Sequence, residues 1–258
     1  MRLGNVAGQA STLNQLGTLC DGLLGRTEEA VAFYRQAVDK YVEIRDVAAE
    51  GRYRNNLAIS LRKLRRLDEA RQEIRQAIAC GAQFGHASQP WKSWAALAAI
   101  ETDAGSAAGA AEAKGKAIAS YLAYRGAGDE NHEGPGRLTF DVTQALLAGD
   151  PATAESLLQQ QQLAADPDAT WLLTFIRALQ AIVAVRRDRT LADAPELSSR
   201  MAAEILFLIE TLERHPREQR EQAQPEIPRG KSPARGADAP GRRWRSIAEI
   251  ARTWWRGQ

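Results

Sequence analysis

The three histidines are the side chains best suited to acid–base or metal chemistry, and their spacing argues against both. His86, His132 and His215 lie far apart, without carboxylates or cysteines at ligand spacing. The Asn131-His132-Glu133 triplet lies among glycines and acidic residues, which is typical of a solvated turn. Gly230-Lys231-Ser232 lacks the upstream glycine of a phosphate-binding loop. The sequence therefore predicts a protein that is not an enzyme and has no metal site and no cofactor.

Side-chain amides and isolated cations form a second group of candidate residues. The amides occur as the neighbours Asn14-Gln15 and Asn55-Asn56. An amide both donates and accepts hydrogen bonds. Arg52, Arg62 and Lys92 are cations in the same part of the sequence. The helices that carry these residues decide whether they can act together.

Those helices belong to a repeat with a spacing of about 40 residues, since Leu16-Gly17 returns as Leu57-Ala58 and Leu97-Ala98. In each copy a large residue, a leucine and a small residue follow at spacings that place them on one helical face. These sets are Leu13/Leu16/Gly17, Arg54/Leu57/Ala58 and Trp94/Leu97/Ala98. The small residue predicts a close approach by a second helix.

The second helix of each copy follows a break at Gly25, Arg65 or Gly105. In the first two copies it opens with acidic pairs, Glu28-Glu29 and Asp68-Glu69, which complement the helix dipole. Small residues then recur along it at Ala30/Ala37, Ala70/Ala77 and Ala110/Ala117. Each copy is therefore predicted to be an antiparallel pair of helices.

Residues 3–125 resemble the tetratricopeptide repeat, whose pattern has a large residue, leucine and a small residue followed by two spaced alanines. The long spacing and the segments Leu-Asn-Gln-Leu-Gly and Arg-Asn-Asn-Leu-Ala resemble the kinesin-light-chain-like variety, of the kind found in bacterial signalling proteins. The resemblance implies an all-α, tetratricopeptide-repeat-like α-solenoid of antiparallel helix hairpins. Its repeats are expected at about 7–46, 47–87 and 88–125.

The resemblance also implies a scaffold or adaptor that binds a peptide or protein partner in a groove along the first helices. Asn14, Asn55 and Asn56 would hold the partner's main chain there, and Arg52, Arg62 and Lys92 would meet its acidic side chains. The alternative role for the asparagines is to bridge adjacent helices. In the third copy the equivalent positions are Ala95 and Ala96. A second functional hypothesis is a regulatory or sensor module detached from a larger bacterial signalling protein, linked to an ATPase or a protease.

Beyond the repeats, a loop at 126–136 precedes a helical closing block at 137–215, in which Asp150-Pro151 and Asp166-Pro167 read as helix starts. Proline, glycine and charge dominate residues 216–243, which predicts a disordered linker. Expected helices span 7–23, 26–45, 47–64, 67–83, 89–104, 106–125, 137–148, 151–164, 167–187 and 195–214.

The basic charge of the chain is concentrated at its end. Residues 216–258 contain ten basic and five acidic residues, and 244–258 form a short, basic, amphipathic segment with Trp244, Trp254 and Trp255. Such a segment could contact an anionic membrane or a nucleic acid, and the alternative is docking on the protein's own body.

Two further expectations concern association and location. Met1–Gly8 resembles the junction between repeats, so Leu13, Leu16, Leu19 and Leu23 of the first helix would form an uncovered flank and favour self-association through the N-terminal repeat. Cys20 and Cys80 are interpreted as reduced and buried, which favours the cytoplasm. The apolar run 171–185 is too short to span a bilayer.

Overall fold

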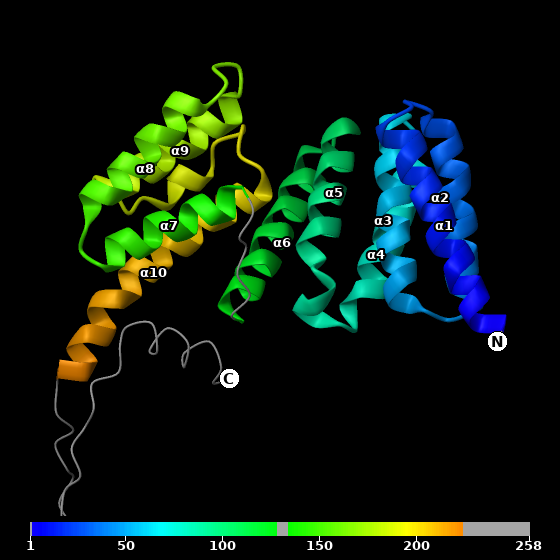
Figure 1. The fold of residues 1–258 in the computed structure, drawn as a ribbon, viewed down its shortest axis with the longest axis horizontal. Coiled ribbons are helices and arrows are strands. Elements are labelled where there is room, and N and C mark those ends of the chain that lie inside the picture. The colour runs from blue at the N-terminus through cyan, green and yellow to red at the C-terminus, as the bar shows by residue number, and fades with distance from the viewer. Residues whose placement is uncertain (1, 128–133, 224–258) are drawn as a thin grey trace, which may run out of the picture. The chain divides into compact units, whose positions relative to one another are not determined.

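The computed structural model describes residues 2–127 and 134–223, and these form helices and no strand, which confirms the all-α prediction (Figure 1). The α-helices are α1 (Arg2–Gly22), α2 (Thr27–Glu43), α3 (Val47–Lys63), α4 (Leu67–Ala82), α5 (Pro90–Asp103), α6 (Ala107–Gly126), α7 (Pro135–Leu147), α8 (Pro151–Ala164), α9 (Thr170–Val183) and α10 (Ser199–Ala223). Two short 3-10 helices are η1 (Gly85–Ser88) and η2 (Arg189–Ala192).

The chain divides into two compact units. The first takes in residues up to Tyr124 together with Leu197–Ala203, and the second takes in Arg125–Glu196 and the chain from Glu204 onward. In the first unit α1 packs on α2, α2 on α3, α3 on α4, and α4 on α5, as expected for successive antiparallel hairpins. Figure 1 shows α1 to α4 lying side by side.

The core of the first unit follows the repeat signature. Leu57, Leu61 and Ile74 are fully buried in one cluster that also holds Tyr34 and Leu97. The predicted close approach occurs in the first hairpin: a Cβ added at Gly17 would lie 2.7 Å from the Tyr34 ring. At Gly51 an added Cβ would lie 2.9 Å from the Cβ of Cys80. Glycine is therefore required at both positions by the packing of the neighbouring helix.

The predicted breaks between paired helices are left-handed turns. Gly25, Arg65 and Gly105 have φ values of 65°, 61° and 75°. A residue in this conformation ends a helix and lets the last carbonyls be satisfied, as in the bond from the Arg66 amide to the Leu61 carbonyl. Glycine adopts the conformation without strain, whereas the Cβ of Arg65 makes this conformation sterically unfavourable.

Ion pairs act both within and between hairpins. Arg54 on α3 binds Glu73 on α4 at 2.6 Å within one hairpin, whereas Arg66 reaches Glu28 on α2, in the preceding hairpin, at 3.3 Å. Arg71 on α4 binds both oxygens of the buried Glu101 on α5, at 2.8 and 2.9 Å. These hydrogen bonds from Arg71 hold the pKa of Glu101 below its ordinary value. The pairs made by Arg66 and Arg71 connect one repeat to the next.

The second unit has its own apolar core. Phe175, Ile176 and Leu179 of α9 are fully buried, as are Ile205 and Leu208 of α10. Asp150 caps α8 as expected, since its carboxylate accepts from the Thr153 amide at 3.1 Å.

Several details of the helices differ from the prediction. Asp166 caps only a turn and not a helix: its carboxylate accepts from the Asp168 amide, and α9 begins later, at Thr170. The first helix begins at Arg2, so residues 2–8 are helical and do not form a junction. η1 interrupts the expected connection before α5. α10 continues to Ala223, past Pro216, because residues 217–223 are strong helix formers. Residues 224–258, and with them most of the predicted linker and the basic segment, lie outside the described residues.

Val185, just after α9, offers a direct stability test. It is β-branched yet has a φ of 71°, and its side chain is 77% exposed. We expect Val185→Gly to stabilise the second unit by about 1 kcal/mol, because it relieves backbone strain and removes no packing. Denaturant unfolding measures the change in the free energy of unfolding. Val185→Ala shortens the same side chain but keeps the backbone strain, so equal unfolding midpoints for the two variants would contradict the prediction.

Candidate functional site

A groove in the first unit brings together five of the six predicted binding residues. It has a volume of about 760 Å³ and is lined by α1, α3, the end of α4, the α4–α5 connection and the start of α5. The predicted residues in its lining are Asn14, Arg52, Asn55, Asn56 and Lys92. The helix register inferred from the repeat explains this, because first helices of successive repeats present equivalent positions to one face.

The asparagine side chains of the groove differ in their hydrogen bonding. Asn56 Nδ2 donates to Asn14 Oδ1 at 3.1 Å, which bridges α3 and α1. Asn55 Oδ1 is buried and has no hydrogen-bond partner among the described residues. A buried carbonyl oxygen without a donor is costly, and Asn55 lines the groove, so rotation of its side chain toward a ligand would give this oxygen a donor. The asparagines therefore include both a helix-bridging pair and a buried amide oxygen that has no donor among the described residues.

The two groove cations differ from the other predicted cation. Arg52 and Lys92 are exposed and form no ion pair within the described part of the chain. Arg62 does not line the groove; its Nε donates to Asp103 Oδ2 at 2.6 Å, which ties α3 to the end of α5. Arg62 therefore links two repeats through Asp103 and does not share the groove with Arg52 and Lys92.

The lining also includes residues that the repeat pattern did not indicate. Tyr53 stacks on Tyr41 with ring centroids 4.7 Å apart, and burial raises the pKa of Tyr41 to about 12. Phe84, Ser88 and Gln89 come from the α4–α5 connection. The sequence signal for them was the longer connection expected between the helices at 67–83 and 89–104.

Comparison with known proteins agrees with this architecture. The tetratricopeptide repeat family matches residues 10–39, which span the second half of α1 and most of α2. These findings support a tetratricopeptide repeat protein. No curated protein and no solved structure matches the chain. The match lies in the first hairpin, and the α3–α4 and α5–α6 hairpins follow the same pattern of helices and breaks.

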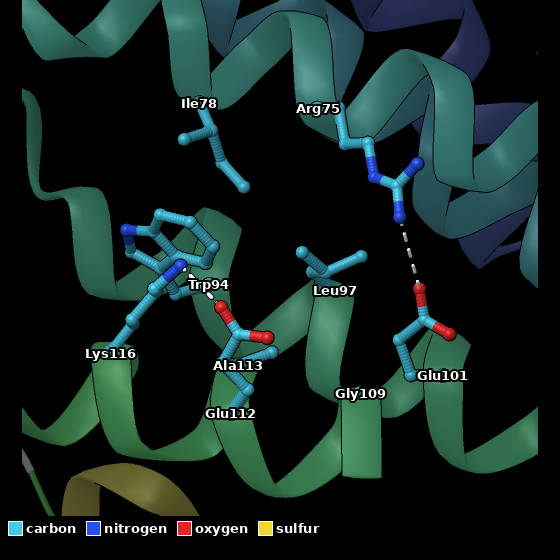
Figure 2. Close-up of a pocket in the computed structure, with 9 residues that line it drawn as sticks. All are labelled: Arg75, Ile78, Trp94, Leu97, Glu101, Gly109, Glu112, Ala113 and Lys116. Carbon is cyan, nitrogen blue, oxygen red and sulfur yellow. Dashed lines mark hydrogen bonds and ion pairs between the residues drawn. The ribbon is translucent and has the colours of Figure 1, made fainter. Parts of the chain in front are cut away.

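A second, smaller cavity of the first unit lies among α4, α5 and α6 and has a volume of about 220 Å³ (Figure 2). Its charged groups pair with one another: Lys116 binds Glu112 at 2.6 Å, and Arg75 lies 3.7 Å from Glu101. Lys116 Nζ also lies 4.7 Å from the centre of the Trp94 ring. Because the charged side chains that line this cavity pair with one another, they connect the helices. They leave few polar groups that could recognise a ligand.

Other kinds of site find no support in the described residues. No group of three or more histidine, cysteine, aspartate or glutamate side chains there is placed to hold a metal ion. Within the same residues, no helix combines the length and apolarity needed to cross a bilayer. The two cysteines are free; Cys20 is buried as expected, whereas Cys80 is only partly buried.

Proposed function

We propose that the protein is a non-enzymatic scaffold or adaptor whose groove holds an extended, acidic segment of a partner protein. Tetratricopeptide repeats are generally protein–protein interaction modules, which supports a protein partner. The observation that carries the proposal is the charge of the groove: Arg52 and Lys92 line it unpaired, and none of its described lining residues is acidic. An anionic segment would therefore meet attraction and no like charge.

The amides would fix the orientation of that segment. A main-chain N–H of the partner would donate to Asn55 Oδ1 once this side chain rotates into the groove, since the oxygen is buried and has no donor among the described residues. The Asn14–Asn56 pair lies beside it and keeps α1 and α3 in register. Because the cations are exposed, their contribution to binding would weaken as salt screens them.

The test is a selection of binders from a random-peptide library displayed on phage, using the wild-type protein. We expect enrichment of glutamate and aspartate, and we expect Asn55→Ala with Asn56→Ala to weaken the selected peptides by about tenfold, since each lost hydrogen bond is worth about 1 kcal/mol. Fluorescence anisotropy measures the affinity, and circular dichroism confirms that the double variant folds.

Gln36→Ala with Gln72→Ala is the matched control, because it removes two exposed amides that do not line the groove. An absence of acidic enrichment, or equal affinity of the asparagine variant and wild type, would overturn the proposed function. Loss of binding in the control as well would show that the effect is not specific to the groove.

Three finer hypotheses accompany this proposal. A regulatory module of a larger signalling protein would use the same groove for a segment of that protein. Self-association through α1 is favoured by its exposed leucines, with Leu16 38% and Leu19 43% accessible and Leu23 beyond the helix 80%. The two free cysteines fit a reducing compartment such as the cytoplasm. Membrane or nucleic-acid contact by 244–258 concerns residues outside those described.

A further inference from the structure

The α4–α5 connection differs from the other links in the first unit. It runs from Gln83 to Gln89 and contains η1, whereas the α2–α3 link spans only Ile44–Asp46 and the α3–α4 link only Leu64–Arg66. A hairpin array needs only a short link at this point, so the additional length is not required for packing. Phe84, Ser88 and Gln89 of this connection line the groove.

Hydrogen bonds hold the connection in place. The Ser88 hydroxyl can donate to two carbonyl oxygens: Oγ lies 3.0 Å from that of Gly81 and 2.9 Å from that of Gly85. The Phe84 amide donates to the Gly81 carbonyl at 3.0 Å. Gln89 closes the segment with a φ of 53°, a conformation that non-glycine residues adopt only when their surroundings impose it. The main chain at Phe84 is therefore fixed before any ligand arrives.

This fixed segment leaves an aromatic ring in solvent. Phe84 is 41% exposed, whereas Leu57, Ile74 and Leu97 of the neighbouring helices are buried in the core. An exposed aromatic ring in a preformed groove is the kind of residue that supplies binding energy when a ligand covers it. The described lining thus offers a ring for apolar contact as well as Arg52 and Lys92 for charge.

We infer that Phe84 is a specificity-determining residue of the groove, and that the ligand class is an extended acidic segment that also carries an apolar side chain in contact with Phe84. The inference rests on the proposed function, because it assigns a further subsite to the same groove. Charge would bring the segment to the groove, and Phe84 would set which acidic segments remain bound.

The peptide selection described above tests this with added variants. In peptides selected on wild type, an apolar residue should recur at a fixed distance from the acidic residues. Phe84→Ala should bind these peptides about tenfold more weakly, the loss typical of a truncated aromatic anchor. A new selection on the Phe84→Ala variant should still enrich acidic residues, but the selected peptides should no longer share an apolar residue at a fixed distance from them. Phe84→Leu should retain the apolar preference.

Trp171→Ala is the matched control, since Trp171 is an aromatic residue on α9 with a similar exposure of 44% and does not line the groove. Acidic peptides that bind wild type and Phe84→Ala equally, or that show the same apolar position in both selections, would overturn the role of Phe84 and leave the proposed function standing. A wild-type selection without acidic enrichment would overturn both.

Discussion

Leu57→Asp is expected to unfold the first unit. Leu57 is 1% exposed and packs in a cluster to which all six helices from α1 to α6 contribute. A carboxylate there would have no cation within the apolar cluster, and burying an unpaired polar or charged group costs several kcal/mol. Total stabilities of domains are only about 5–15 kcal/mol, so this single change should remove most of the unit's stability.

Circular dichroism during heating measures this effect, with a large loss of helicity at temperatures where wild type is folded. The matched control is Ile59→Asp on the same helix, because Ile59 is exposed and the new charge stays in water. An unchanged melting curve for Leu57→Asp would show that the repeat register is wrong. Equal destabilisation by the two variants would show that the charge, and not its burial, is responsible.

Glu204→Ala should produce the second large effect, in the second unit. Arg125 Nη2 lies 3.6 Å from Glu204 Oε2, and the two side chains are 3% and 0% exposed. The guanidinium carbon of Arg125 also lies 4.6 Å from the centre of the Phe207 ring. Removing Glu204 takes the carboxylate away from a buried cation, which typically costs about 3–5 kcal/mol.

Replacing both charges should have a different outcome. Arg125→Met with Glu204→Met removes the buried charges together, so we expect stability within about 1 kcal/mol of wild type or above it. Denaturant unfolding compares the two variants. Lys116→Ala with Glu112→Ala removes an exposed pair and should cost about 1 kcal/mol or less. Equal stability of Glu204→Ala and the double variant would contradict the expected cost of removing one partner of this buried pair.

The sequence by itself determined the local architecture of the repeats. The three- and four-residue spacing around Leu57 and Leu97 specified helical faces, and Gly25, Arg65 and Gly105 marked the turns between paired helices. These features depend on helix geometry and backbone sterics, which act within a few residues. The same register was enough to place Asn14, Asn55 and Asn56 in one groove, although their binding role stays a proposal.

Only the tertiary structure decided which side chains meet across repeats. Arg62 looked equivalent to the groove cations, but the packing of α5 beside α3 places Asp103 within 2.6 Å of it. Phe84 gave no periodic signal because it lies in a connection, whose path depends on hydrogen bonds from Ser88. Arg125 and Glu204 are also far apart in the chain. Such contacts are set by the relative position of whole helices, which no local spacing encodes.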